Sequence, residues 1–158
     1  MSGKKKRAEI RGVLLPLQSG QLLLPNMLMS EVIGYREPDE IPVGSPDWLL
    51  GVIVWRHLPV PVVSFDVLLG APQQGAGHRA RIALCKTISE ASTRPYTAFL
   101  LQSIPRLVSV TEKSISAIAS DNRQNPLLAH HVNINDQEAW IPDLDALEQS
   151  LTEVLGKA

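Results

Sequence analysis

Hydrophobic and polar residues alternate over several short stretches of the chain, and this alternation predicts β-strands. Apolar, β-branched residues are densest between Gly51 and Gly70. Here the pattern predicts two strands joined by a tight turn and followed by a short helix that Asp66 opens as its cap. The turn contains Arg56, almost the only charge of the stretch before Asp66. A cation at the tip of a hydrophobic hairpin is expected to project into solvent or onto a partner.

Strand patterns recur elsewhere along the chain. The remaining strands are expected over residues 12–17, 21–24, 79–88, 96–104 and 107–110, with a further short element around 115–118. Pro16 favours an edge strand or a bulge for the first of them. Residues 28–33 fit either a short turn of helix or an irregular strand. The proline-rich segment 35–46 is expected to be a surface loop that Ile41 and Val43 attach to the body.

The last part of the chain repeats the central pattern. When Asp66 is placed over Asp145, an offset of 145 − 66 = 79 residues, the two stretches align without a gap. Ile53 then falls on Val132 and Trp55 on Ile134. Both copies are expected to form a strand, a tight turn, a second strand and a helix, and the second helix continues to Leu155. Two copies suit two related lobes packed on one another.

Short strands separated by glycine and proline, with little helix, indicate a mainly β fold. Such patterns suit β-barrels or a sandwich, and two small barrels, with short helices and a C-terminal helix, also account for the repeat. With 158 residues the chain is long enough for such a domain. Residues 1–11 are basic and are expected to form a flexible tail, and residues 12–158 one domain of two repeated lobes.

The residue types argue against several functional classes. No glycine-rich phosphate loop and no nucleophile elbow is found, so the chain is expected not to be an enzyme. No cofactor is expected. No metal site is expected either, because the adjacent His130 and His131 would point to opposite faces of a strand and could not both bind one metal ion. Cys85 lies in an apolar run and is expected to be a buried, inert thiol. No signal peptide or membrane span is evident, so a cytosolic location is expected.

Three motifs occur in a fixed order. Ser30 to Tyr35 reads S-E-V-I-G-Y, Pro46 to Arg56 reads P-D-W-L-L-G-V-I-V-W-R, and Val60 to Asp66 reads V-P-V-V-S-F-D. Together they resemble the CheW-type chemotaxis coupling family, which shows a V-x-E-I type segment, then P-x-W/F-L-x-G-V-x-N-L-R-G, then V-P-V-V-D-L. The resemblance extends over nearly the whole chain, since the later strands and the terminal W-I-P-D-L-D-A-L also fit the family layout.

The resemblance implies two small, five-stranded, SH3-like β-barrels that share a core, and a non-catalytic scaffold role. Such proteins link the cytoplasmic tips of chemoreceptors to the regulatory domain of a CheA-like histidine kinase, and they meet the membrane only through the receptors. The chain is similar to divergent, auxiliary members that serve pilus-linked (twitching) chemosensory systems. Kinase binding is expected to occur barrel against barrel, through exposed strand edges.

Several residues match family positions. Arg56 matches the arginine of the N-L-R-G turn, which the resemblance implicates in receptor coupling, and Glu31 matches the glutamate of the first motif. The family's Asn, Leu and Gly are replaced by Val54, Trp55 and His57, and histidine lacks the freedom of glycine at positive φ, so a different turn geometry is expected. The candidate receptor-side residues are Met29, Glu31, Gly51, Val54, Trp55, Arg56 and His57.

Alternatives remain open for single residues and for the whole chain. Met29 and Val32 fit a core or an interface, and Trp55 fits a core position or an interface anchor. A stand-alone β-barrel could bind nucleic acid or another protein through the basic Lys4–Arg7 arm, but the net charge of −1 argues against nucleic acid. A hydrolase would need a convergent polar cluster, and a free-standing structural domain would need no partner.

Overall fold

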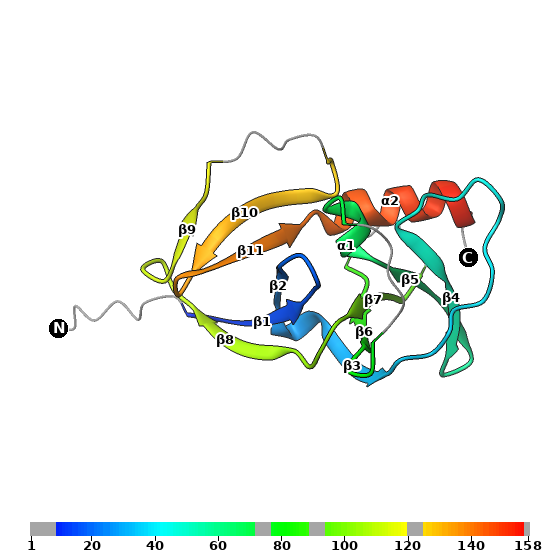
Figure 1. Cartoon of the computed structure of the whole chain (residues 1–158), viewed down its shortest axis with the longest axis horizontal. Helices are drawn as coiled ribbons and strands as arrows, with labels where there is room; N and C mark the ends of the chain where they lie inside the picture. Colours follow the sequence, from blue (N-terminus) through cyan, green and yellow to red (C-terminus); the bar gives the residue numbers. More distant parts are fainter. Residues whose placement is uncertain (1–8, 72–76, 89–93, 120–124, 157–158) are drawn as a thin grey trace.

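The computed structural model describes residues 9–71, 77–88, 94–119 and 125–156. The basic cluster at residues 4–7 lies outside the described residues. Ile10 and Arg11 belong to the first strand, so the expected tail ends before them. The fold prediction is confirmed in that the chain is mainly β, with two sheets and a C-terminal helix (Figure 1). The expectation of five strands in each half is wrong for one sheet, which has six.

One sheet combines strands from both ends of the chain. It has six strands in the order β8 (Arg106–Val110), β1 (Ile10–Pro16), β2 (Gln21–Pro25), β11 (Gln137–Pro142), β10 (Leu128–Ile134) and β9 (Ile115–Ala117). The second sheet has five strands in the order β3 (Met29–Gly34), β6 (Arg81–Lys86), β7 (Tyr96–Leu101), β5 (Leu58–Val63) and β4 (Leu49–Trp55). The 3₁₀-helix η1 (Asn26–Leu28) and the helices α1 (Phe65–Leu68) and α2 (Leu144–Leu155) complete the fold.

The strands of the predicted repeat coincide. After the predicted shift β4 and β5 have the same bounds as β10 and β11, and α1 and α2 begin at matching residues, Phe65 and Leu144. The register irregularity after Leu49 recurs after Leu128. β5 and β11 each join their sheet through a parallel pairing, with β7 and β2 respectively. The two halves are therefore built on one plan.

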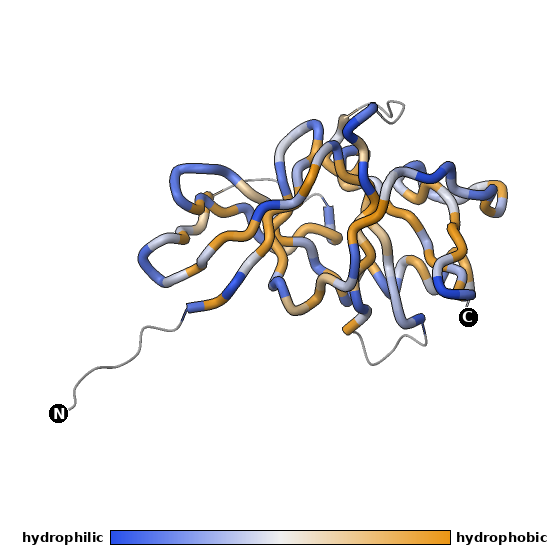
Figure 2. Tube along the Cα trace, turned by 90° about the horizontal axis from the view of Figure 1, so that it is seen from below, coloured by the Kyte–Doolittle hydropathy of each residue, from blue (hydrophilic) through white to orange (hydrophobic). Residues whose placement is uncertain are grey.

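The strands at the junction of the sheets are buried on both faces. In β1, Leu15 packs into a core shared by both sheets, whereas Leu14 faces a smaller apolar cluster inside the first sheet. In β6, Ala83 faces the shared core, whereas Leu84 faces a cluster inside the second sheet. Burial on both faces explains the continuous apolar runs of these strands. Figure 2 shows hydrophobic stretches along the strands and hydrophilic ones in peripheral loops.

The expectation that Pro16 marks an edge strand or a bulge is wrong. β1 is paired on both sides, with β2 and with β8. Its pairing with β8 ends at Leu14, before the proline is reached. Pro16 is the last residue of the strand and its carbonyl accepts a hydrogen bond from Gln102. A proline is tolerated there because no ladder partner needs its missing N–H.

Asp66 does not cap α1, which corrects the prediction. The cap is Ser64, whose hydroxyl accepts from the Val67 N–H at 3.4 Å. The buried Asp66 carboxylate instead accepts hydrogen bonds from the backbone N–H groups of Gln18 (3.0 Å) and Ser19 (2.8 Å) and from the Ser19 hydroxyl (2.7 Å). These bonds hold the β1–β2 turn against α1 and thereby link the two sheets.

For residues 28–33 the sequence fits either a turn of helix or a strand, and the structure has both, since η1 ends at Leu28 and β3 begins at Met29. The loop that follows is attached by Asp39, which exchanges two backbone hydrogen bonds with Val52 of β4. Ile41 packs on the shared core as expected. Val43 is fully exposed and does not attach the loop, which is a further correction.

Candidate functional site

The hairpin between β4 and β5 turns within two residues, Arg56 and His57, both of which have positive φ (50° and 66°). The corresponding residues of the second copy, Asn135 and Asp136, have φ of 49° and 64°. Positive φ at both central positions is the mark of a type I′ turn, whose twist matches that of the flanking strands. His57 takes a positive φ although it lacks the conformational freedom of the glycine in the family motif. The hairpin register imposes the left-handed conformation on an unfavourable residue.

Arg56 has two contacts that orient its side chain. Its guanidinium lies 3.4 Å from the Glu31 carboxylate of β3 and 4.4 Å from the centre of the Trp55 ring. The Arg56 and Glu31 side chains are 63% and 42% exposed, so the pair contributes little to stability. The ion pair and the cation–π contact instead fix the position of the Arg56 charge, which they hold over one end of the second sheet.

The other three residues of the turn motif Val54–His57 differ in their exposure to solvent. Trp55 is buried at 5% exposure and packs edge-to-face on Tyr96, with ring centres 4.8 Å apart. It is therefore a core residue, which settles the alternative left open by the sequence. Val54, on the edge strand β4, is 59% exposed, and His57 is exposed at the turn. Val54 and His57 therefore present their side chains to solvent beside Arg56, whereas Trp55 does not.

Glu31 also lines an apolar groove between β3 and the segment that leads into β8. The groove has a volume of about 290 Å³. Its walls combine Met29, Glu31 and Val32 from β3 with Ile104, Pro105 and Leu107. Ile104 and Leu107 are 64% and 72% exposed. Exposed apolar side chains gathered along one groove are typical of an interaction surface.

Gly51 has a structural role at another point of β4. Its φ is +151°, and a Cβ built on it would lie 2.2 Å from the Asp39 carbonyl oxygen. The absence of a side chain thus allows residues 38–39 to approach the strand. Gly51 is buried and does not line the groove of Met29 and Glu31. Among the described parts of the chain, the candidate residues therefore divide into exposed turn positions (Val54, Arg56, His57), two groove walls (Met29, Glu31) and two supporting positions (Gly51, Trp55).

The sequence reading missed Ile104, Pro105 and Leu107 as site residues. A signal was present, because Leu107 and Val108 are adjacent apolar residues in a strand and cannot both face one core. Val108 packs inside the first sheet and Leu107 faces solvent. The adjacency indicates one surplus apolar side chain, although not which of the two is exposed.

Cys85 is buried as predicted, with its sulfur 3.6 Å from the Met29 sulfur. Burial raises the pKa of this thiol to about 12.

We expect Cys85 of the folded protein not to react with a thiol reagent at pH 8 and to react fully in urea, with the reaction followed by absorbance. Because the thiolate forms at lower pH in the unfolded chain, stability is expected to decrease as pH rises above about 8.5. Native labelling at the rate of the unfolded chain would contradict this assignment.

Other site types were sought in the same part of the molecule. Within the described residues, no group of three or more His, Cys, Asp or Glu side chains is placed to hold a metal ion. His131 stacks on Trp140 with ring centres 3.9 Å apart, whereas His130 is exposed. None of the helices in these ranges is long and apolar enough to span a bilayer.

Two sheets with a shared core and an open apolar groove beside a fixed charge are typical of a protein-interaction module. The profile of the CheW-like domain family matches residues 11–151, so this chain belongs to that family. The fold is similar to the crystal structure of the scaffolding protein TtCheW from Thermoanaerobacter tengcongensis, with a TM-score of 0.73 and 18% identity over 95% of this chain and 97% of that one. At this identity the likeness concerns the fold. No curated protein matches the sequence.

Proposed function

We propose that this protein is a non-catalytic, cytoplasmic adaptor that couples chemoreceptors to a CheA-like histidine kinase. Family membership supports the scaffold role, and the similar TtCheW is itself described as a scaffolding protein. The observation that carries the proposal is the apolar groove of Met29, Val32 and Leu107 beside the Glu31–Arg56 pair.

The chemistry of the groove suits the helical tip of a receptor. A helix bound in a groove needs apolar contacts for affinity and a few charged contacts for register. Val32, Ile104 and Leu107 provide exposed apolar surface, and Arg56 and Glu31 provide one charge of each sign at its border. The kinase regulatory domain would then bind at a free strand edge of either sheet.

Single variants separate the receptor contact from the kinase contact. Leu107→Asp places a charge in the groove and is expected to weaken binding of a receptor-tip fragment at least about 30-fold, as for a central interface residue. Arg56→Ala is expected to weaken it less, because the arginine lies at the exposed border. Titration calorimetry with a receptor-tip fragment and with a kinase regulatory domain from the same source measures both.

Val43→Asp is the matched control, because Val43 is an aliphatic residue of the 35–46 loop that is fully exposed and outside the groove. Both fragments should bind this variant as they bind the wild type. Unchanged receptor affinity in Leu107→Asp would refute the groove assignment. Loss of kinase binding in Arg56→Ala would move Arg56 to the kinase contact, and no binding of either fragment by the wild type would refute the adaptor role.

A pilus-linked system is the proposed setting. The support is the replacement of the family's Asn, Leu and Gly by Val54, Trp55 and His57 at the turn. A turn whose sequence departs from the family motif suits an adaptor that serves a receptor of its own. Deletion of the coding sequence is expected to impair twitching and to leave swimming chemotaxis intact, and the reverse result would contradict the assignment.

A further inference from the structure

A second hollow is lined in part by α1 and α2. Figure 1 shows these helices on the side of the molecule away from β3 and β8. The volume of the hollow is about 550 Å³, within the range of ligand-binding clefts. The walls come from four segments that are distant in sequence: residues 46–48, α1, residues 125–127 and the last turns of α2. Glu153 and Val154 of α2 lie beyond the part of the chain matched by the family profile.

The helices that line the hollow differ in length between the two repeats. α1 ends after four residues, whereas α2 continues for twelve. The longer helix buries Leu147 and Leu151 in the shared core and extends Ser150, Glu153 and Val154 along the hollow. The last turns of α2, which have no counterpart in α1, therefore form one wall of the hollow.

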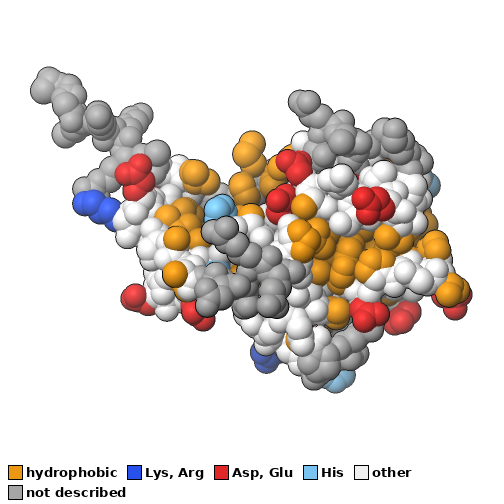
Figure 3. All heavy atoms as spheres, turned by 90° about the horizontal axis from the view of Figure 1, so that it is seen from above, with side chains coloured by type: hydrophobic (Ala, Val, Ile, Leu, Met, Phe, Trp, Pro, Cys, Tyr) orange, Lys and Arg blue, Asp and Glu red, His pale blue; other side chains and the backbone are white. Residues whose placement is uncertain are grey.

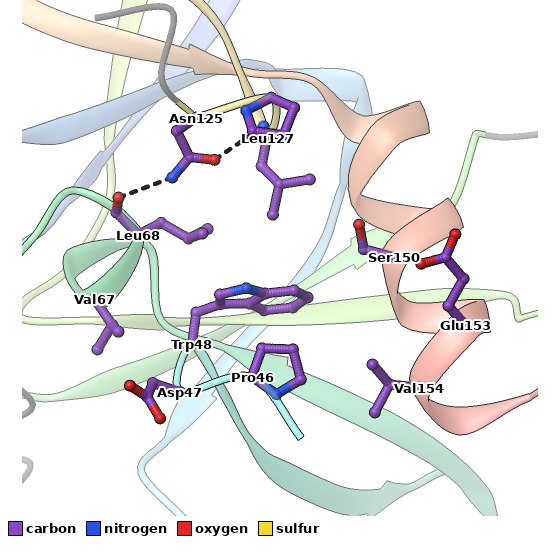
Figure 4. Close-up of a pocket in the computed structure, with 11 residues that line it drawn as sticks. Pro46, Asp47, Trp48, Val67, Leu68, Asn125, Leu127, Ser150, Glu153 and Val154 are labelled. Atoms are coloured by element: carbon purple, nitrogen blue, oxygen red, sulfur yellow. Dashed lines mark hydrogen bonds between the residues drawn. The ribbon is translucent and has the colours of Figure 1, made fainter. Parts of the chain in front are cut away.

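The walls are held by hydrogen bonds and are formed before any partner binds. Asn125 donates from its amide to the Leu68 carbonyl at 2.9 Å and accepts from the Leu127 N–H at 3.0 Å, and Figure 4 shows both bonds. The Trp48 carbonyl accepts from the Ser64 N–H at 2.8 Å. Preformed walls lower the ordering cost of binding.

The lining is apolar at its centre and acidic at its sides. Trp48, Leu68 and Val154 line the hollow. Asp47 and Glu153 lie on opposite sides of the Trp48 indole in Figure 4. Neither carboxylate has a hydrogen-bond or ion-pair partner among the described residues, and no described Lys, Arg or His lines the hollow. Figure 3 shows hydrophobic surface bordered by acidic side chains on this face.

We propose that this hollow, bounded by Trp48, Leu68, Val154, Asp47 and Glu153, binds a basic amphipathic segment of a partner protein. One apolar side chain of the segment fills the space beside Trp48, and a lysine or arginine on each side of it pairs with Asp47 and Glu153. Charge complementarity selects this occupant, because an acidic or neutral segment would leave both carboxylates unpaired next to apolar surface. The surface is separate from the receptor groove and does not depend on the proposed coupling function.

The probe is a synthetic helical peptide with leucines at i and i+4 flanked by lysines, and its counterpart has glutamate at each lysine position. The ¹⁵N-labelled full-length chain is titrated with each peptide, and the indole N–H signals of Trp48, Trp55 and Trp140 are followed after assignment with Trp48→Phe. We expect saturable movement of the Trp48 signal with the lysine peptide only. The buried Trp55 signal should stay fixed, and affinity should fall as salt is raised.

Glu153→Lys is expected to weaken binding of the lysine peptide at least about ten-fold, because a repulsive charge pair replaces an attractive one. Glu112→Lys is the matched control, since Glu112 is an exposed carboxylate in the turn before β9, at the other end of the molecule. Equal binding by Glu153→Lys and wild type, equal binding of the glutamate peptide, or shifts confined to β3 and β8 would each overturn the proposal. If a peptide of residues 1–11 binds more tightly than the lysine peptide, the proposal is also overturned, because the occupant would then be a second copy of this chain. Receptor and kinase binding are measured separately, so failure here leaves the adaptor proposal intact.

Discussion

Replacing Glu148 by alanine is expected to destabilise the protein by about 3–5 kcal/mol, the largest effect of any single change considered. Glu148 lies in α2 and is buried at 4% exposure. Its carboxylate accepts a hydrogen bond from Arg94 at 3.1 Å and from the Thr97 hydroxyl at 2.6 Å. The Arg94 guanidinium also donates to the Gly156 carbonyl at the end of α2. Removing the carboxylate leaves a buried arginine charge without this partner, and that cost dominates the effect.

The urea midpoint of unfolding, followed by circular dichroism, measures this loss. Glu153→Ala is the control, because Glu153 lies on the exposed side of the same helix and is expected to change stability by no more than about 0.5 kcal/mol. Replacing both partners, with Arg94→Met and Glu148→Leu together, should recover much of the loss because no buried charge remains. A Glu148→Ala midpoint equal to that of Glu153→Ala would show that the pair is not important for folding.

Glu148 illustrates what the sequence does and does not reveal. Helical spacing places it between Leu144 and Leu151 on the apolar stripe of α2, so its burial could have been predicted. A buried carboxylate needs a partner. The partner is Arg94, which is 54 residues away in the sequence. Local periodicity identifies the faces of an element, but it does not identify which distant charge meets it.

The repeat was the most informative part of the sequence. Aligning Asp66 with Asp145 predicted two copies whose strand bounds and helix starts coincide in the structure. The role of Asp66 was nevertheless wrong, because the hydrogen bonds to Gln18 and Ser19 depend on how the two sheets pack. Alignment reproduces local structure that both copies share, whereas packing between the sheets is where they differ.

The candidate site was predicted in part. Arg56 and Glu31 were identified by resemblance, and the structure places them 3.4 Å apart. Leu107 was missed, although it contributes exposed apolar surface to the groove beside Glu31. The groove is made by β3 and the approach to β8, which belong to different sheets, and strand patterns carry no information on that contact.

Replacing Gly51 by alanine is the second change with a large expected effect. A left-handed backbone at a residue with a side chain costs about 1–3 kcal/mol. The added Cβ would also meet the Asp39 carbonyl oxygen at 2.2 Å and the Pro38 Cβ at 2.6 Å. Residues 38–39 would have to move, which breaks the two hydrogen bonds between Asp39 and Val52. We expect Gly51→Ala to lower stability by about 3 kcal/mol in urea unfolding.

Gly34→Ala provides the matched control, because nothing lies within 4 Å of a Cβ built at Gly34 and its φ is not positive. Its urea midpoint is expected to stay near that of the wild type. The comparison also bears on Gly51 as a receptor-side candidate, since Gly51 is buried beneath residues 38–39. If Gly51 acts through structure alone, Gly51→Ala loses stability and receptor-fragment affinity together, whereas Arg56→Ala loses affinity at unchanged stability. Weakened receptor binding by a Gly51→Ala protein of wild-type stability would instead place Gly51 in the contact, against the geometry of this strand.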